Sequence, residues 1–152
     1  RSKMYWLEAI IIVALETGAR QGELFRLSAN DTDLNVGTAK LRNTKNGTDR
    51  KIGLSPKAVE TLKSLPALNV DGRFFPTHTE QFKFYWKQLQ RWTGLRHINF
   101  HLLRHEWTSR MFEQGWDIAE VATQGGWHDW KSLRRYTHIK AEHLAEKFRL
   151  IK

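Results

Sequence analysis

Arginines and a tyrosine are the residues of this sequence whose types and surroundings best suit chemistry. Arg20 lies in the string Thr-Gly-Ala-Arg-Gln-Gly-Glu-Leu, and Arg104 lies in His-Leu-Leu-Arg-His. A guanidinium group binds phosphate oxygens through paired hydrogen bonds, so two separated arginines can clamp a phosphate. Tyr136 follows two further arginines, and nearby positive charge favours the phenolate of a tyrosine, whose ordinary pKa is about 10. These residues suit attack by a tyrosine on a phosphodiester.

A lysine beside a turn could supply the proton that the leaving oxygen needs. Lys45 immediately precedes Asn46-Gly47, and Asn-Gly between two short segments is a strong signal of a β-hairpin. A lysine at such a tip can deliver a proton when the loop closes over a substrate. Lys40 and Lys51 lie in the same hairpin and compete for this role.

Helical spacing groups the polar residues around Arg104. His101, Arg104, His105 and Thr108 follow an i, i+3, i+4, i+7 pattern, which predicts one polar face of a helix. The histidine pair, one helical turn apart, could instead share a zinc ion. Arg104 would then lie between the ligands, and no third ligand is obviously paired with them, so we expect no metal site. Ordinary core or surface histidines are the other alternative.

The composition favours one basic domain with a polyanionic partner. The 152 residues are enough for a single core, and the formal net charge is +9. Clustered cations bind a phosphate backbone with release of counterions, although a merely soluble basic protein is the alternative. The chain has no cysteine, which excludes disulfides, thiolate catalysis and cysteine-based zinc sites.

No segment has the character of a membrane span. The longest apolar run, Ala9 to Leu15, is bounded by Glu8 and Glu16 and is far shorter than the ~20 residues that a bilayer requires. The basic start is not followed by a signal-peptide pattern. We therefore expect no membrane partner and a cytoplasmic protein.

The elements that must position these residues are mostly helical. Apolar periodicity, capping residues and turn residues predict helices at 4–16, 20–27, 56–65, 80–92, 101–114, 117–124, 130–137 and 140–149, with strands at 38–42 and 50–54. We expect a mainly α fold with a small antiparallel β-sheet (α+β).

Together these segments resemble the catalytic domain of tyrosine recombinases, the phage integrase family. The motifs that carry the resemblance are a first arginine box, Thr17-Gly18-Ala19-Arg20-x-x-Glu23-Leu24; a hairpin lysine, Thr44-Lys45 with Arg50-Lys51-Ile52-x-Leu54; a second box, His101-x-x-Arg104-His105; and a third, Gly125-Gly126-Trp127 with Tyr136-Thr137-His138. The resemblance spans nearly the whole chain and implies the tyrosine recombinase catalytic-domain fold.

The resemblance also implies a reaction. Tyr136 would attack the scissile phosphate to give a 3′-phosphotyrosyl link and a free 5′-hydroxyl, while Arg20 and Arg104 stabilise the charge of the transition state. Lys45 would protonate the departing oxygen, and His101 would act as an acid or base near the nucleophile. The covalent link retains the bond energy, so neither a metal nor another cofactor is implied.

Supporting positions follow from the same resemblance. Glu23 would orient the first box, and His105 is a supporting or alternate residue. The family usually places a histidine or tryptophan shortly before the nucleophile. Trp127 is favoured for this position, with His128 as the alternative if the segment is one residue shorter.

Family members are larger than this chain, so residues 1–152 are expected to be a single catalytic domain, a fragment without the N-terminal core-binding and arm-binding domains. The implied partner is double-stranded DNA at attachment sites, bound by a tetramer in the full-length protein, with DNA-bending accessory proteins. Leu144, Phe148 and Ile151 form an apolar stripe suited to docking on a neighbouring copy or on the chain's own core.

The implied function is site-specific DNA recombination by a prophage or mobile-element integrase, in the cytoplasm and nucleoid of a bacterial host. A non-catalytic DNA-binding module would explain the charge and the helices, but not the order of arginine, lysine, histidine and tyrosine motifs. A type IB topoisomerase would use nearly the same phosphotyrosine chemistry to relax DNA. A histidine-based metalloenzyme is the third alternative.

Overall fold

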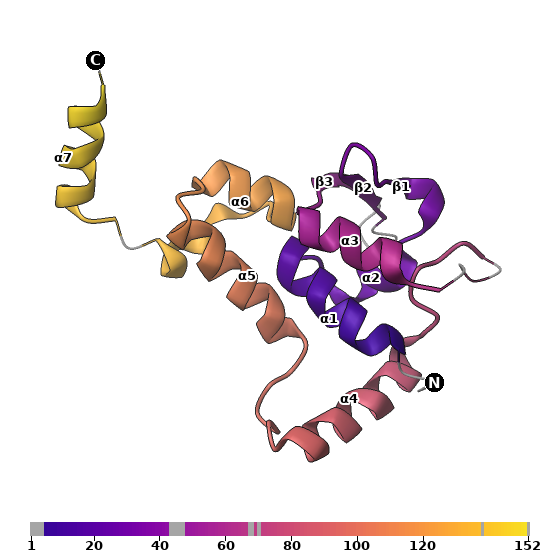
Figure 1. The fold of residues 1–152 in the computed structure, drawn as a ribbon. Coiled ribbons are helices and arrows are strands. Elements are labelled where there is room, and N and C mark those ends of the chain that lie inside the picture. The colour runs from indigo at the N-terminus through magenta and orange to yellow at the C-terminus, as the bar shows by residue number, and fades with distance from the viewer. Residues whose placement is uncertain (1–4, 43–47, 67–68, 70, 138, 152) are drawn as a thin grey trace.

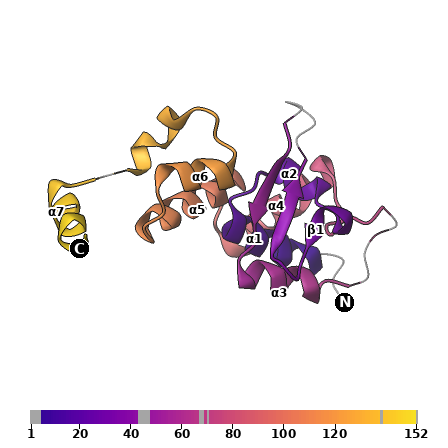
Figure 2. The same ribbon diagram turned by 90° about the horizontal axis from the view of Figure 1, so that it is seen from above.

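The computed structural model describes residues 5–42, 48–66, 69, 71–137 and 139–151. Within these residues the chain is mostly helical and carries a small antiparallel sheet, as the sequence predicts (Figures 1 and 2). The elements in chain order are α1 (Tyr5–Thr17), α2 (Gln21–Arg26), η1 (Ala29–Asp31), β1 (Thr32–Asp33), β2 (Thr38–Leu41), β3 (Arg50–Gly53), α3 (Pro56–Ser64), α4 (Thr79–Thr93), α5 (His101–Glu113), α6 (Ile118–Gly125), η2 (Trp130–Tyr136) and α7 (Ala141–Leu150).

Helix α1 lies at the centre of the main hydrophobic core. It is apolar nearly all round, with Ile10 and Val13 fully buried, and it packs against α3 and α5. The helix ends at Gly18, which has a φ of +73°, and a β-carbon there would stand 2.3 Å from the ring of Trp107 on α5. Glycine is therefore required both for the left-handed conformation and for the close approach of α5.

The small sheet lies beside this core, with β2 between β1 and β3 and both pairings antiparallel. The register pairs Leu41 with Arg50 at one end of β2 and β3. Both predicted strands are confirmed, each one residue shorter than expected. Strand β1 was not predicted, because two residues are too few to show an alternating pattern. Lys45 and the Asn46-Gly47 dipeptide lie outside the described residues.

Helices α3 and α4 complete the main core. Ser55 caps α3 by accepting a hydrogen bond from the amide of Ala58 at 3.1 Å. Helix α4 packs its aromatic side inward, where buried Phe82 stacks on Trp86 with ring centroids 5.7 Å apart. The helix predicted at 80–92 is present as α4.

A smaller hydrophobic cluster joins α5, α6 and η2 around Trp107, Val121, Ala122 and Leu133. The helix predicted at 130–137 is present as η2, and it is a 3₁₀ helix. With three residues per turn, Leu133 and Tyr136 lie on the same side of η2 and both pack on this cluster. The tighter helix therefore brings Tyr136 against α5.

Helix α7 stands apart from the rest of the chain in both views (Figures 1 and 2). None of its residues is buried. The predicted stripe of Leu144, Phe148 and Ile151 is exposed, so the structure does not dock this helix on the chain's own core.

Candidate active site

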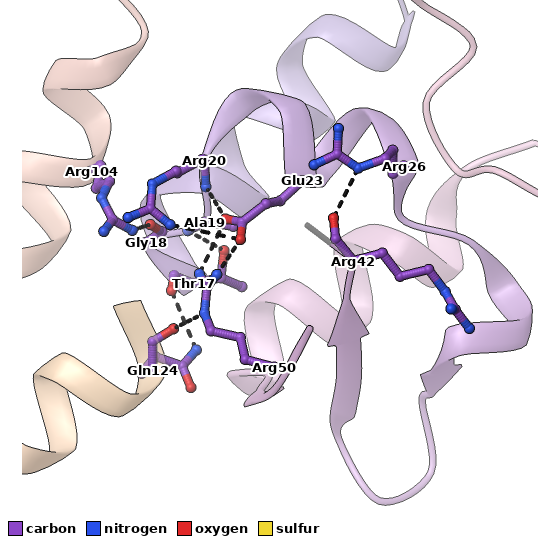
Figure 3. A network of polar contacts seen from close by, with 10 residues as sticks. All are labelled: Thr17, Gly18, Ala19, Arg20, Glu23, Arg26, Arg42, Arg50, Arg104 and Gln124. Carbon is purple, nitrogen blue, oxygen red and sulfur yellow. Dashed lines mark hydrogen bonds and ion pairs between the residues drawn. The ribbon is translucent and has the colours of Figure 1, made fainter. Parts of the chain in front are cut away.

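Arg20 caps the start of α2 and Arg104 lies on α5. Figure 3 shows the two side chains near one another. Arg104 is 3% exposed, and its Nη1 donates a hydrogen bond to the carbonyl of Gly18 at 2.8 Å. Burial lowers the pKa of Arg104 to about 9, with a further contribution from the positive charges of Arg20 and Arg50. Burial also lowers the pKa of Arg20. With a pKa of about 9, Arg104 stays protonated at neutral pH and makes the site electropositive.

Glu23 joins the first arginine box to the sheet. Its carboxylate is 2% exposed and accepts a hydrogen bond from the backbone amide of Arg20 at 2.8 Å. Arg50 on β3 donates to the same carboxylate through both of its terminal nitrogens, one of them at 3.1 Å. A buried carboxylate needs such partners because desolvation of an unpaired charge is costly. The implied orienting role of Glu23 is therefore matched by its contacts.

Gln124 joins the end of α6 to the same strand. Its side-chain oxygen accepts from the amide of Gly53 at 2.9 Å, and its side-chain nitrogen donates to the carbonyl of Gly53 at 2.8 Å. The nitrogen also lies 3.3 Å from the carbonyl of Thr17, and Nε of Arg50 donates to the Gln124 carbonyl at 3.1 Å. Figure 3 shows how these contacts meet the Glu23 contacts at Arg50. The third box is thereby fixed to the first box and to β3.

Trp127 lies beside Arg104, whereas His128 is exposed. The guanidinium carbon of Arg104 stands 3.8 Å from the ring centroid of Trp127, a cation–π contact that also shields the arginine from water. A β-carbon on Gly125 would stand 2.1 Å from the Trp127 ring, and one on Gly126 would stand 2.8 Å from the Arg50 guanidinium. The paired glycines therefore allow both contacts.

Tyr136 meets the second box at His105. The Tyr136 hydroxyl forms a hydrogen bond with Nδ1 of His105 and accepts another from Nη2 of Arg135 at 3.0 Å. The rings of His101 and His105 are perpendicular, with centroids 4.7 Å apart. Partial desolvation of the two rings lowers the pKa of both histidines, and positive neighbours that include Arg104 and Arg135 lower it further. The tyrosine and both histidines therefore share one electropositive site.

One expectation about α5 needs correction. His101 is exposed and His105 is half-buried, but Thr108 is 0% exposed and donates its hydroxyl proton to the carbonyl of Arg104 at 2.8 Å. Threonine can satisfy its hydroxyl within its own helix, so it can be buried. The polar face therefore extends only as far as His105.

The structure adds site residues that local motifs did not assign. Arg50 and Gln124 connect the boxes. Arg50 binds Glu23, which is 27 residues away in the chain, and Gln124, which is 74 residues away. Two signals could have found Arg50: it lies in the hairpin-lysine motif, and an acidic residue such as Glu23 in an apolar helical segment requires a cationic partner. Lys45 is not among the described residues. The two competing lysines, Lys40 and Lys51, are both exposed. Nζ of Lys40 lies 3.8 Å from the carboxylate of Asp49.

In the described part of the chain, no three histidine, aspartate or glutamate side chains are grouped in a way that could hold a metal ion. No helix there combines the length and the apolar character that crossing a membrane requires.

The chain is similar in sequence to a known recombinase. The shufflon-specific DNA recombinase of Escherichia coli is 38% identical over 148 residues, an alignment that covers 97% of this chain and 38% of that protein. The chain thus spans well under half the length of this relative.

Solved structures share the fold. The Tn1549 transposon integrase in complex with circular intermediate DNA superposes with a TM-score of 0.74 at 20% identity, over 98% of this chain and 61% of that one. The catalytic domain of bacteriophage HP1 integrase superposes with a TM-score of 0.71 at 22% identity, over 96% of this chain and 82% of that one. The expected tyrosine recombinase catalytic-domain fold is confirmed.

The family model described as the phage integrase family matches residues 1–143. This match takes in all the motifs around the arginines and Tyr136, and the described members of those motifs meet in one site. The chain belongs to the phage integrase family.

Proposed function

We propose that this chain is the catalytic domain of a site-specific DNA recombinase that cuts and rejoins DNA strands through a 3′-phosphotyrosyl intermediate. The observation that carries the proposal is that Arg20 and Tyr136 both lie close enough to Arg104 to act on its charge, in one electropositive site. Family membership supports it, as does the similarity to the shufflon-specific DNA recombinase.

The arginines bind the scissile phosphate. Their guanidinium groups can donate to its non-bridging oxygens, and their charge is worth most in the transition state, where negative charge on these oxygens grows. Nη2 of Arg104 is buried and has no hydrogen-bond partner among the described residues, so it is a donor still to be satisfied. Glu23 holds the backbone of Arg20 in place, and Trp127 covers Arg104.

The chemical step exchanges one phosphodiester for another. Oη of Tyr136 forms a bond to phosphorus while the bond from phosphorus to O5′ breaks. Lys45 gives a proton to O5′, and His101 assists beside the phosphate. In the second step a 5′-hydroxyl from a partner strand attacks the phosphotyrosine and releases Tyr136. Side chains supply all the positive charge that this path needs.

The substrate we propose is double-stranded DNA at a recombination site. The charge of +9 supports a polyanionic partner, and structural relatives are solved in complex with DNA. We also propose that recombination requires four copies, with α7 of one copy docked on the next, and that accessory proteins bend the DNA. The exposed stripe on α7 supports the inter-copy contact.

Replacement of Tyr136 by phenylalanine tests the nucleophile. The substrate is a nicked duplex from which the short strand released by cleavage diffuses away, so that the covalent adduct is trapped. The wild-type chain should form a denaturant-resistant DNA adduct. Tyr136→Phe should abolish this adduct while DNA binding survives. Tyr5→Phe, at an exposed tyrosine, is the matched control and should form the normal adduct. A normal adduct from Tyr136→Phe would eliminate this function.

The same preparation separates the alternatives. A non-catalytic DNA-binding module binds DNA and gives no adduct with any variant. A type IB topoisomerase relaxes a supercoiled plasmid of arbitrary sequence, whereas the recombinase we propose forms its adduct at a defined site and joins strands from two duplexes.

A further inference from the structure

The hydroxyl group of Tyr136 lies between side chains from two elements. It forms a hydrogen bond with Nδ1 of His105 on α5, and it accepts one at 3.0 Å from Nη2 of Arg135, its neighbour in η2. Within the part of the chain that the structure describes, the hydrogen bonds of this hydroxyl run to these two residues and none runs to His101. The oxygen atom that would react is therefore held by His105 and Arg135.

The donors around His105 determine which of its ring nitrogens carries the proton. Arginine has hydrogen-bond donors and no acceptor, and Nη2 of Arg135 lies 3.1 Å from Nδ1 of His105. That nitrogen must present its lone pair, which leaves the proton of the neutral ring on Nε2. The Tyr136 hydroxyl is then the donor in its bond to Nδ1. The phenol proton points at a nitrogen that is able to take it.

The surroundings of His105 keep its ring neutral and therefore able to accept a proton. Burial lowers its pKa below the ordinary value of 6.5, and the positive charges of His101 and Arg104 on α5 and of Arg135 on η2 lower it further. Phe112, which stacks on the Tyr136 ring with centroids 6.4 Å apart, adds no charge. The negative charge of a bound phosphodiester would favour the imidazolium at the moment of proton transfer.

The directions of the two arginine side chains in η2 explain why Arg135, and not Arg134, contacts the Tyr136 hydroxyl. Arg135 folds back over the neighbouring ring, with its guanidinium carbon 5.0 Å from the ring centroid of Tyr136. Arg134 is exposed, and its backbone carbonyl accepts the amide hydrogen of Thr137 at 3.1 Å. The two adjacent arginines thus carry the same charge, but only Arg135 touches the reactive oxygen.

We propose that His105 is the base that takes the proton of Tyr136 and that Arg135 stabilises the resulting phenolate. This inference rests on the proposed function. The O–H bond of Tyr136 breaks, the proton moves to Nδ1 of His105, and the electron pair left on Oη forms the bond to phosphorus. The bond from phosphorus to O5′ breaks, and O5′ keeps its electron pair and takes a proton from Lys45. In the rejoining step the proton returns from His105 to Oη.

A change of leaving group separates the base from the acid. A nicked duplex with sulfur in place of the bridging O5′ releases a thiolate, which leaves without protonation. Lys45→Ala should therefore be slow on the oxygen substrate and recover on the sulfur substrate. His105→Gln keeps a hydrogen-bond acceptor but cannot take a proton, so its single-turnover cleavage should fall about 100-fold or more on both substrates. Recovery of His105→Gln on the sulfur substrate would overturn the assignment.

The pH profile gives a readout that a merely structural role would not change. Wild-type cleavage should reach a plateau once His105 is neutral. Without the base, hydroxide from solution must remove the phenol proton, so the rate should keep rising about tenfold per pH unit where the wild type is flat. A His105→Gln profile parallel to that of the wild type would contradict the proposal.

The adjacent arginines provide a matched pair for the second residue. At saturating protein, Arg135→Ala should cleave about tenfold or more slowly than Arg134→Ala, since both remove one positive charge but only the first removes a phenolate contact. Equal rates would remove Arg135 from the proposal. If Tyr136→Phe still forms an adduct, the proposed function itself fails; if Tyr136→Phe is inactive and His105→Gln behaves as wild type, only this inference fails.

Discussion

Arg104 shows most clearly how single residues set the properties of this site. Its guanidinium group is buried, stacked on Trp127 and bonded to the Gly18 carbonyl, and its pKa falls to about 9 because burial and neighbouring cations oppose its charge. The protein therefore holds a cation where its charge is poorly compensated. A bound phosphate would relieve this repulsion, which makes the site selective for anions.

Arg104→Lys tests whether the shape of this cation matters as well as its charge. Lysine keeps the charge but lacks the planar fork that can reach Gly18 and phosphate together. We expect single-turnover cleavage to fall about 100-fold or more. Arg96→Lys, at an exposed position, should cleave as wild type. Undiminished cleavage by Arg104→Lys would show that charge alone suffices.

The histidines of the second box should make folding sensitive to acid. The pKa of His101 and His105 lies below 6.5 in the folded chain, through burial first and positive neighbours second. Between the folded-state pKa values and 6.5 the unfolded chain binds more protons. Their contribution to stability is therefore complete above 6.5 and is lost as the pH falls through the folded values.

We expect Tm to fall as the pH is lowered below about 6.5, and thermal unfolding followed by circular dichroism measures this. The double variant His101→Gln, His105→Gln should lose less Tm over the same acid step. His97→Gln, in an exposed loop, should keep the wild-type acid sensitivity. An acid response unchanged in the double variant would place the effect elsewhere.

At the scale of elements, the site depends on three segments that meet through side chains rather than through sheet or helix pairing. Glu23 on α2 and Gln124 on α6 both bind β3, and Arg50 touches both of them. Strand β3 therefore connects the first and third boxes. A rigid frame of this kind keeps the phosphate-binding arginines in place while substrate binds.

Gln124→Ala should loosen that frame. The variant removes the side-chain partner of the exposed amide and carbonyl of Gly53, at a cost of about 0.5–1.5 kcal/mol of folding free energy per hydrogen bond, and it should slow cleavage more than it weakens DNA binding. Urea unfolding and single-turnover cleavage measure the two effects. Gln114→Ala, at an exposed glutamine at the end of α5, should change neither. Wild-type stability and cleavage would remove Gln124 from the frame.

Elements with a strong local signal were predictable from the sequence. The apolar stretch that Gly18 ends became α1, and the Ser55-Pro56 start became α3, within one or two residues of the expected bounds. The type of η2 was not predictable, because its 3₁₀ form follows from the packing of Leu133 and Tyr136 on α5 and α6. Burial of Thr108 likewise depends on the neighbouring helix.

The residues of the site also fall into those that the sequence predicted and those that it did not. Arg20, Arg104 and Tyr136 stood out because each lies in a recognisable motif. Gln124 lies outside these motifs, and Arg50 lies in the hairpin-lysine motif without a role of its own, because the partners of both residues are distant in the chain. Long-range partners become visible only when the fold brings the segments together.

At the scale of the whole molecule, α7 contributes no residue to either hydrophobic cluster. That helix projects away in both views (Figures 1 and 2), and its apolar side chains include Phe148 at 72% exposure. Exposed apolar side chains in such a row are typical of a surface that another protein covers. This agrees with the proposed contact between copies on DNA.

Phe148→Ala should weaken assembly on DNA. Removing a large aromatic contact should raise the protein concentration needed to form the four-copy complex by about tenfold, as measured by sedimentation with paired duplexes. Glu146→Ala, on the opposite side of the same helix, should assemble as wild type. Equal assembly by Phe148→Ala would argue against docking through this stripe.

The most direct measurement is the identity of the residue that carries the DNA. The chain is trapped on a nicked duplex, the DNA and protein are digested, and mass spectrometry locates the residual nucleotide on a peptide. We expect a nucleotide joined through its 3′-phosphate to Tyr136 and to no other residue. A nucleotide on Tyr5, Tyr85 or a histidine, or one joined through its 5′-phosphate, would contradict the proposed reaction.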